Sequence, residues 1–397
     1  MRRLKLAMFV LSTACFVLPA AFGDPAPAEA PAGFDNQPNG LVDQERFDFL
    51  REIFEERETI EDGLGPVYNA QACAECHQSP ITGGASQITE LRAGRFDGSR
   101  FVEHPGGSLI NDRAIDAGYQ EKVLPGHGVR ALRSSLSILG DGFVECIDSN
   151  DLVAISRNQP WSMRGQLIQV PVLEADGALR AGRFGWKNQH ASLVSFSADA
   201  YLNEMGITSP LQPDENTSMG RPVDDIDGVE DPEDEGEDIE FFAEFMRATK
   251  VPPRDVELAS TPNAQAGSRL FDQLACAVCH VRTLTTAPPG TRINGGAFIV
   301  PQALGSKVIH PFGDFLLHDV GTGDGIVQNG GGSTRNKLRT APLWGLRARN
   351  RFLHDGRALT LQEAIQAHRG EASTATSRYF SLTDGQKNQL LTFLRSL

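Results

Sequence analysis

Residues 71–80 read QACAECHQSP, and residues 274–283 read LACAVCHVRT. Both stretches contain Cys-x-x-Cys-His, the pattern by which c-type haem is attached: two thiols bond the haem vinyl groups and the histidine faces the iron. A zinc site made from two CxxC pairs needs no histidine after each pair, and a thioredoxin-like redox site needs only one motif. The sequence therefore predicts two covalently bound c-type haems. The predicted haem-binding residues are Cys73, Cys76, His77, Cys276, Cys279 and His280.

The sequence around the two motifs repeats in outline. A helical apolar pattern precedes each motif, two further segments recur downstream of it, and each half ends in an amphipathic helical pattern. Two haem modules of similar plan are therefore expected. The recurring pairs are VDQERFDFLREIFEE (42–56) with NAQAGSRLFDQLA (263–275), LRSSLSILG (132–140) with LRTAPLWGL (338–346), RFGWKNQHASL (183–193) with RFLHDGRALTL (351–361), and residues 238–249 with 383–397.

These features predict a mainly α fold of two cytochrome c-like haem modules, at about 40–255 and 256–397. The first module carries extra residues, about 141–183, whose weak alternation and turn signals indicate a small insertion that contains short strands. MRRLKLAMFVLSTACFVLPAAFG (1–23) has the basic start, short apolar run and small residues of a secretory signal peptide. The Pro/Ala-rich residues 24–39 indicate a flexible tether. The mature protein is expected in the periplasm.

The chain is acidic, with a formal net charge of −14, which argues against nucleic acid as a partner. Much of this charge lies in DDIDGVEDPEDEGEDIE (224–240). A solvated loop is the plain interpretation of that run, and a calcium site or a docking surface for a basic partner are the alternatives. No segment after the signal peptide is long and apolar enough to span a membrane. We therefore expect no integral membrane segment in the mature chain.

The two halves differ in the residue that follows each RF segment. Phe352 is followed sixteen residues later by His368, in LQEAIQAHRGEA, whereas Phe184 is followed twenty residues later by Glu204, in ADAYLNEMGIT. If both positions lie over the open face of a haem, haem two receives a second imidazole and haem one receives a carboxylate. A carboxylate beside an open iron can transfer protons. The alternative is that Glu204 is exposed and His368 only caps a helix.

Taken together, these segments resemble the bacterial di-haem oxidoreductases, a family of peroxidases and thiol oxidoreductases related to the di-haem cytochrome c peroxidases. The resemblance runs from about residue 40 to the C-terminus. It implies a periplasmic enzyme with two covalent haems and often a calcium ion between the modules. In the peroxidases, the N-terminal haem reduces hydrogen peroxide with electrons relayed through the C-terminal haem from a small cytochrome c or cupredoxin. The matching stretches are GLGPVYNAQACAECH, RFGWKNQHASL, NEMGITSPL, HPFGDFLLHDVGTG, LRTAPLWGL and FLHDGRALTLQEAIQAHRGEA.

The resemblance also implies roles for single residues. Glu204 falls on the catalytic glutamate of those peroxidases, and Trp186 falls near the tryptophan between their haems. His368 falls where they carry a methionine ligand to the relay haem. His127, in LPGHGVRALRSS, resembles the histidine that is the removable sixth ligand of their peroxidatic haem. His104, in VEHPGG, is a rival for that last role.

Three positions depart from the family pattern. Histidine instead of methionine at residue 368 makes haem two a weaker oxidant than the usual relay haem. Phe196 stands eight residues before Glu204, where the peroxidases usually place a glutamine, so the pocket is expected to lack one hydrogen-bonding group. Val320 replaces the methionine of the His-Asp-Met-Gly segment that related oxidoreductases often have.

Several other polar residues have open assignments. His318 and His354 are expected to bond haem propionates or the backbone rather than iron. Arg339 and Arg357 could pair with propionates, because an arginine fork suits a carboxylate, or with carboxylates on the surface.

The resulting interpretation is a di-haem peroxidase. Peroxide is reduced at the N-terminal haem, with Glu204 as the proton-transferring residue and Trp186 as a relay between the haems. Two alternatives remain: an electron-transfer cytochrome whose irons are both six-coordinate, and an oxidase of a thiol or protein substrate.

Overall fold

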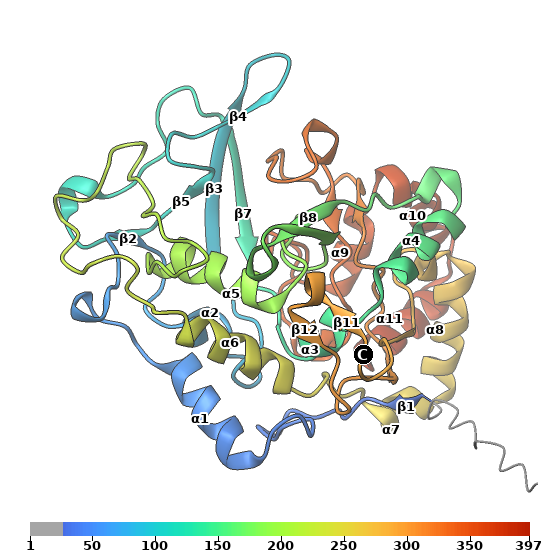
Figure 1. Cartoon of the computed structure of the whole chain (residues 1–397). Coiled ribbons are helices and arrows are strands. Elements are labelled where there is room, and N and C mark those ends of the chain that lie inside the picture. Colours follow the sequence, from blue (N-terminus) through green and yellow to red (C-terminus); the bar gives the residue numbers. More distant parts are fainter. Residues whose placement is uncertain (1–26) are drawn as a thin grey trace, which may run out of the picture.

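The computed structural model describes residues 27–397 and is drawn in Figure 1. The predicted signal peptide, residues 1–23, lies outside the described residues. Among residues 27–397, no helix combines the length and the apolar character needed to cross a bilayer.

The first described residues lie along the body of the protein. β1 (Ala28–Glu29) pairs in parallel with β13 (Lys307–Ile309). The Asn39 side-chain amide donates hydrogen bonds of 2.8 and 2.9 Å to the backbone carbonyls of Arg247 and Thr249. The described part of the segment expected to be a flexible tether is therefore held at one end by strand pairing and at the other by side-chain hydrogen bonds.

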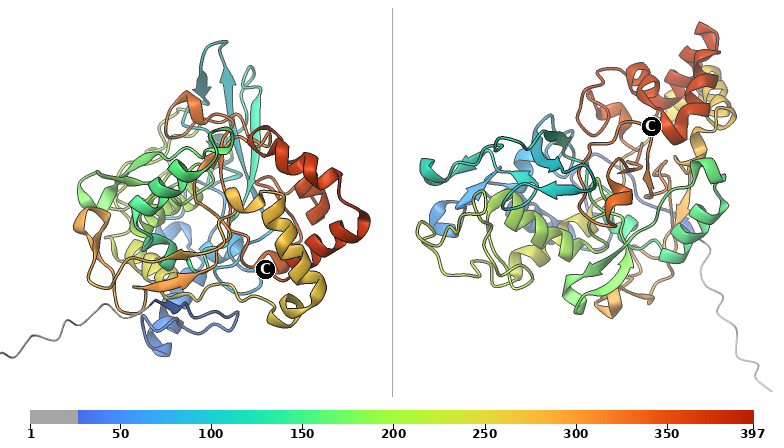
Figure 2. Two further views of the ribbon diagram at one scale, coloured as in Figure 1. Left: turned by 90° about the vertical axis from the view of Figure 1, so that its right-hand side faces the viewer. Right: turned by 90° about the horizontal axis from the view of Figure 1, so that it is seen from above.

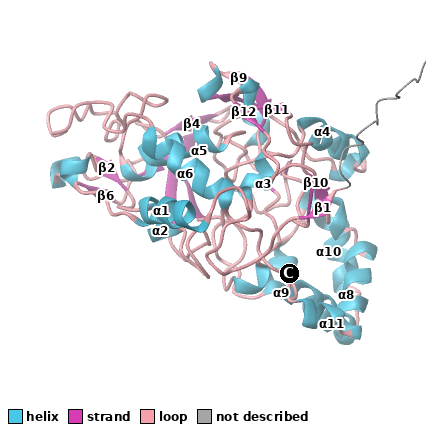
Figure 3. Cartoon of the chain, turned by 60° about the horizontal axis from the view of Figure 1, so that its bottom comes forward, coloured by secondary structure: helices cyan, strands magenta, loops and turns pink. Residues whose placement is uncertain are grey.

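The fold mixes α and β structure, so the prediction of a mainly α protein is wrong. Helices make up 34% and strands 16% of the structure, and Figure 3 shows them as short pieces joined by long loops. The missed strands are hard to recognise because most of them are short, and because β3 (Thr89–Phe96) contains Glu and Gly, which are depleted in strands. In TELRAGRF (89–96), Glu90 and Arg92 face a cavity instead of solvent, so polar residues stand where an apolar face was expected.

The largest sheet has four strands and is centred on β3 (Thr89–Phe96). β3 pairs antiparallel with β7 (Val129–Ser134) over six residues, from Thr89 opposite Ser134 to Gly94 opposite Val129. β4 (Phe101–Glu103) and β5 (Leu109–Ile110) also pair with β3. Figure 2, seen from above, places this sheet on the opposite side of the molecule from the C-terminal helices.

The helix predicted before the first motif is α1 (Gln44–Glu55). Asp43 caps it by accepting a hydrogen bond of 2.9 Å from the Arg46 backbone N–H. Its apolar face packs against α6 (Glu237–Ala248), where the rings of Phe54 and Phe245 lie 4.7 Å apart. The Phe54 ring also lies 6.3 Å from the imidazole of His77, so this helix pair forms a wall behind the first motif.

The helix predicted before the second motif is α8 (Pro262–Gln273), which packs along α11 (Asp384–Arg395), side by side in Figures 1 and 3. The two backbones come so close that a Cβ on Gly267 would lie 1.9 Å from the carbonyl oxygen of Gln389, so only glycine fits at this crossing. Phe271 and Phe393 fill the adjoining core with ring centroids 5.4 Å apart. The Phe271 ring lies 6.3 Å from His280, which repeats the arrangement of the first module.

The insertion predicted at about 141–183 contains one hairpin, β8 (Gln169–Val172) with β9 (Ala178–Ala181). It also contains α3 (Asp141–Glu145) and α4 (Ser149–Asn158). The main sheet lies before this insertion in the chain, which is where most of the strand content was missed. The remaining elements are α2 (Cys73–Cys76), α5 (Leu193–Ala200), α7 (Val256–Ser260), α9 (Leu361–Ala367), α10 (Ser373–Phe380), β2 (Val67–Tyr68), β6 (Arg113–Ala114), β10 (Leu284–Thr285), β11 (Arg292–Ile293), β12 (Phe298–Ile299), β14 (Leu317–His318) and β15 (Leu338–Arg339), besides short 3₁₀ turns.

Candidate haem sites

Each Cys-x-x-Cys-His motif lies in the wall of its own cavity. The first cavity, of about 730 Å³, contains the residues of the first motif together with Glu204. The second cavity, of about 220 Å³, contains the residues of the second motif together with His368. Both residues that the repeat predicted opposite the motifs therefore face the cavities expected for them.

The two motifs form the same local turn. α2 covers the first motif, and a 3₁₀ turn (Cys276–Val278) covers the second. One backbone hydrogen bond closes each turn: the N–H of His77 donates to Cys73 at 3.1 Å, and the N–H of His280 donates to Cys276 at 3.0 Å. A single turn places residues i and i+3 on one face, so both thiols and the following imidazole project toward one place.

The motif histidines are oriented as iron ligands. Nδ1 of His77 lies 3.2 Å from the Gly84 carbonyl oxygen, and Nδ1 of His280 lies 3.0 Å from that of Phe312. A carbonyl can only accept, so Nδ1 carries the proton in each ring and Nε2 keeps a lone pair for a metal. Burial lowers the pKa of His77 below its usual value and lowers that of His280 to about 4. Both rings are therefore neutral at pH 7, as metal binding requires.

The motif cysteines have the properties of thiols rather than thiolates. Burial raises the pKa of Cys73, Cys76 and Cys276 to about 12. All the described cysteines are free of disulfides. The two Cys-x-x-Cys pairs line separate cavities, so they do not come together as the four ligands of one zinc ion. Two thiols, one neutral imidazole and an adjoining cavity fit a haem at each motif.

Glu204 lies on a π-helical turn (Tyr201–Met205) at the end of α5, a feature that is frequent at functional sites. The backbone N–H groups of Asn69 and Ala70 donate to its carbonyl at 2.7 and 3.0 Å, and the Asn69 side chain donates to its carboxylate at 2.8 Å. Burial, followed by the nearby charge of Glu90, raises the pKa of Glu204 to about 8. This carboxyl can therefore hold or release a proton near neutral pH.

Two charged residues of the first cavity were missed from the sequence. Glu90 and Arg92 lie two residues apart on β3, so they project from the same face. The guanidinium of Arg92 donates to both oxygens of Glu90, at 2.6 and 3.1 Å. Phe196 lines the same cavity, which places an apolar ring where the peroxidases usually have glutamine. The sequence feature that could have identified Glu90 and Arg92 is the Glu-x-Arg spacing, which places two opposite charges on one face of a strand.

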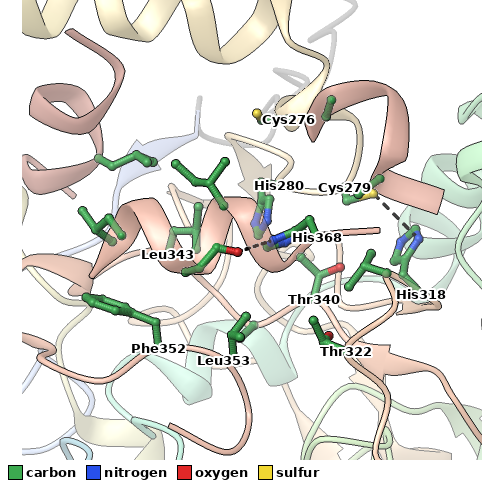
Figure 4. A pocket seen from close by; sticks show the side chains of 18 of the residues that line it. Cys276, Cys279, His280, His318, Thr322, Thr340, Leu343, Phe352, Leu353 and His368 are labelled. Carbon is green, nitrogen blue, oxygen red and sulfur yellow. Dashed lines mark hydrogen bonds between the residues drawn. The ribbon is translucent and has the colours of Figure 1, made fainter. Parts of the chain in front are cut away.

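His368 and His280 both line the second cavity, and Figure 4 shows their side chains in the same part of it. Nδ1 of His368 lies 2.8 Å from the Ala364 carbonyl oxygen, so Nε2 is again left for a metal. Burial lowers the pKa of His368. The second cavity therefore places the imidazole of His368 with that of His280, whereas the first places the carboxyl of Glu204 with the imidazole of His77.

Trp186 and Arg339 line both cavities. The indole N–H of Trp186 donates to the Ser134 carbonyl at 2.9 Å. The Arg339 side chain donates to the Gly185 carbonyl at 2.8 Å, and its backbone N–H donates to the Trp186 carbonyl. Burial lowers the pKa of Arg339 to about 10, so it remains charged at pH 7. An aromatic ring and a cation therefore stand between the two haem sites, where Trp186 was predicted.

His127 and His104 lie together, with ring centroids 4.9 Å apart, and neither is among the residues that line the two cavities. Both ring nitrogens of His104 have backbone neighbours, the Pro105 carbonyl at 3.0 Å and the Leu124 N–H at 3.2 Å. In this conformation the structure does not bring either residue to the first motif.

His318 is bound by two carboxylates rather than by backbone. Its Nδ1 lies 2.6 Å from Glu371 and its Nε2 lies 2.9 Å from Asp314. Although burial lowers it, hydrogen bonds to Asp314, Cys279 and Glu371 raise the pKa of His318 to about 12. A protonated imidazole cannot bind iron, so His318 supplies a positive charge beside the second motif.

His354 and Arg357 lie on the same loop but differ in their surroundings. His354 is buried in the second cavity, with its ring 6.1 Å from that of Trp186. Arg357 is exposed and lies 3.4 Å from Asp355. Of the two partners that the sequence allowed for Arg357, a propionate or a surface carboxylate, the structure therefore shows the surface carboxylate.

The acidic segment contributes to a cluster of four carboxylates whose oxygens all lie within 4.8 Å of one another. Both oxygens of Glu215 and one of Glu233 are buried without a hydrogen-bond partner among the described residues. Burial, followed by the charges of its neighbours, raises the pKa of Glu215 to about 9. The cluster consists of Glu215, Asp227, Asp231 and Glu233.

Two solved structures resemble this chain at low sequence identity. No protein with a curated description matches the sequence. Among solved structures, a Kuenenia stuttgartiensis hydrazine synthase is similar at 16% identity and a TM-score of 0.41, covering 98% of this chain and 100% of that one. A MauG-like protein associated with microbial copper homeostasis is similar at 15% identity and a TM-score of 0.42, covering 97% and 95%. At these scores the structural likenesses carry no assignment.

The assignment rests on sequence instead. The sequence model of one family, described as "Di-haem oxidoreductase, putative peroxidase", matches residues 111–397. This match covers the second motif, Glu204 and His368, and most of the chain. The chain therefore belongs to the di-haem oxidoreductase family, and its cofactors are haems.

Proposed function

We propose that this di-haem oxidoreductase reduces hydrogen peroxide in the first cavity, with electrons delivered through the second. The observation that carries the proposal is the difference between the cavities. The first contains Glu204, a carboxyl whose pKa is raised to about 8, and the second contains His368 in the corresponding place. A proton-transferring group beside one haem and a second imidazole beside the other suit one catalytic and one electron-relay haem.

When bound, the haem of the first cavity supplies an iron that binds peroxide and exchanges electrons. The protein supplies the proton transfer. Glu204 faces the cavity and, because its pKa is raised to about 8, can give a proton to the departing oxygen of peroxide. Asn69 fixes the direction of this carboxyl by its hydrogen bond of 2.8 Å. His77, whose Nδ1 is tied to a carbonyl, would hold the iron through its Nε2.

Electrons are proposed to reach the first cavity by way of Trp186, which lines both cavities. The donor would be a small redox protein, a cytochrome c or a cupredoxin. The net charge of −14 would favour a donor with a basic face, because complementary charge speeds association.

The haems are proposed to be of c-type, attached through both pairs of cysteines. Half-buried thiols beside a neutral imidazole support this attachment, because the thiols take no part in disulfides. Attachment of this kind fits an exported protein, and the sequence of residues 1–23 has the pattern of a signal peptide. We therefore propose that the enzyme acts in the periplasm.

Calcium is proposed at the cluster of Glu215, Asp227, Asp231 and Glu233. Buried carboxylates need a cation or protons to offset their charge, and calcium prefers oxygen ligands. The folded pKa of Glu215, about 9, lies above its usual value. The ionised cluster therefore lowers the stability of the folded protein as pH rises from the usual pKa of a glutamate to about 9. Bound calcium would offset this loss of stability.

Calcium is accordingly expected to raise the unfolding temperature at pH 8 more than at pH 5, where the carboxyls keep more of their protons. A free calcium concentration of 100 times Kd corresponds to about 2.7 kcal/mol of stabilisation. Thermal unfolding with calcium and with a chelator, at both pH values, measures the effect. Glu215→Gln should reduce it. Equal unfolding temperatures with and without calcium at pH 8 would rule out this site.

The proposed function is tested by electron paramagnetic resonance of the oxidised protein before and after addition of hydrogen peroxide. We expect a high-spin ferric signal from the first haem, because no second imidazole lies in its cavity, and a low-spin signal from the second. The high-spin signal should disappear with peroxide. Two low-spin signals that do not respond to peroxide, before or after partial reduction, would instead support an electron-transfer cytochrome.

A further inference from the structure

We propose that Glu90 is a second catalytic carboxyl of the first cavity and that it shares a single proton with Glu204. This inference rests on the proposed peroxide reduction and deepens it, because it names the residue that accepts the proton of peroxide while Glu204 donates one.

The two carboxyls meet in the cavity from different parts of the chain. Glu90 lies on β3 and Glu204 lies on the π-helical turn after α5. Both line the first cavity, and their side chains are close enough to share a hydrogen bond. Both charges act on the thiol of Cys76 in the first motif. The pair therefore adjoins the place where the first haem is attached.

Neighbouring cations decide which carboxyl holds the proton. Arg92 binds Glu90 through two hydrogen bonds of 2.6 and 3.1 Å. Arg133, opposite Glu90 on β7, lies 3.9 Å from the same carboxylate. Although burial raises it, the charges of Arg92 and Arg133 hold the pKa of Glu90 below its usual value. Glu90 is therefore the ionised member and Glu204 the protonated one.

Other charged groups around the pair do not replace either member. Asp199 faces Arg92 from α5, but it is bound to His190 at 3.0 Å. Glu121 is bound to the backbone N–H groups of Asn111 and Met219 at 2.6 and 3.0 Å. The remaining charged residues that line the cavity are Glu75, Asp112, Arg113, Lys122, Asp141 and Arg339.

A pair with one proton contains an acid and a base at the same time. One oxygen of peroxide, called the inner oxygen, stays in the cavity, and the other, the outer oxygen, leaves. The proton on the inner oxygen moves to Glu90. The proton of Glu204 moves to the outer oxygen, the O–O bond breaks, and the outer oxygen leaves as water. The pair still holds one proton, now on Glu90, which returns to Glu204. Two electrons from the donor protein and two protons from solvent convert the remaining oxygen to a second water.

The first test is the infrared band of the protonated carboxyl, followed against pH in the haem-loaded protein without peroxide. The band that Glu204→Gln removes should titrate near pH 8, from the pKa of about 8 of Glu204. In Glu90→Gln its midpoint should fall by at least one pH unit, because the neighbouring negative charge is gone and Arg92 is freed. An unchanged midpoint in Glu90→Gln would overturn the proposal.

The second test is the rate constant for reaction with peroxide between pH 5 and pH 8. The wild-type rate should be flat from pH 5 to about pH 7, because Glu90 stays ionised as the base and Glu204 keeps its proton as the acid, and it should fall by about half at pH 8, where Glu204 titrates. In Glu90→Gln, Glu204 would be the remaining base. The rate constant of this variant should fall about tenfold for each pH unit below the pKa of Glu204, which is the slope of a one-proton titration. If the wild-type rate constant decreased as the pH was lowered from 8 to 5, or if that of Glu90→Gln did not, Glu90 would not be the base.

Glu121→Gln is the matched control, because it removes a carboxylate from the same cavity without touching Glu204, and it should keep the wild-type profile. Glu90→Gln could bind too little haem to be measured. In that case the double variant Glu90→Gln/Arg92→Gln, which removes both members of the ion pair, should show the same fall in rate at low pH. The infrared titration needs no peroxide. If the infrared midpoint shifts in Glu90→Gln but the protein does not reduce peroxide, only the proposed function is rejected. If the protein reduces peroxide but the midpoint does not shift, only the shared proton is rejected.

Discussion

Glu204→Gln is expected to lower the rate constant for reaction with hydrogen peroxide by about 10²- to 10⁴-fold at pH 7, the usual contribution of a general acid or base. Glutamine has the same shape and can still bond Asn69, but it cannot give a proton to the departing oxygen. Glu90 cannot replace it as the acid, because Arg92 holds Glu90 ionised through a hydrogen bond of 2.6 Å. Stopped-flow absorption of the haem after mixing with peroxide measures the rate.

The controls separate this loss from a loss of structure. The variant should bind two haems, and its unfolding temperature should stay near that of the wild type, since glutamine replaces a carboxyl that is already protonated at pH 7. Glu121→Gln, in the same cavity, should keep the wild-type rate. A rate for Glu204→Gln within twofold of the wild type would mean that the carboxyl does not transfer protons, and the difference between the cavities would lose its proposed meaning.

The sequence was informative where chemistry demands fixed spacing. The Cys-x-x-Cys-His pattern places thiols and imidazole on one turn, so both cavities could be located from the motifs. Glu204 and His368 were found by comparing the two halves, because equivalent positions of a repeat occupy equivalent places. The strand pair Leu132-Arg133 and Leu338-Arg339, in β7 and β15, shows that this repeat extends to the backbone conformation.

The sequence was uninformative where contacts join distant segments. Glu90 reaches Glu204 only because β3 and α5 border one cavity, and no local pattern records this. No strand was predicted at β3, where Glu90 and Arg92 face the cavity, and this omission contributed to the wrong prediction of a mainly α fold. His127 was matched by a short segment, Gly-His-Gly, that fixes no position relative to the haem, and the structure holds it beside His104.

His368→Met is expected to raise the reduction potential of the second haem by on the order of 0.1 V, within the span of about 0.8 V that axial ligands cover. Methionine with histidine favours reduced iron more than two histidines do. In the wild type, His280 and His368 both present Nε2 to the cavity, because a carbonyl binds Nδ1 of each. Spectroelectrochemical titration measures the potential, and electron paramagnetic resonance checks the change of ligand.

The exposed His310, bound to Glu29 at 3.1 Å, offers the control: His310→Met should leave both potentials unchanged. Since 59 mV is tenfold for one electron, a rise of 0.1 V moves electrons toward the second haem by about fiftyfold. His368→Met should therefore take electrons from a donor more readily and pass them to the first cavity less readily. A potential that does not move in His368→Met would mean that His368 is not an axial ligand, and the second cavity would then have no assigned ligand opposite His280.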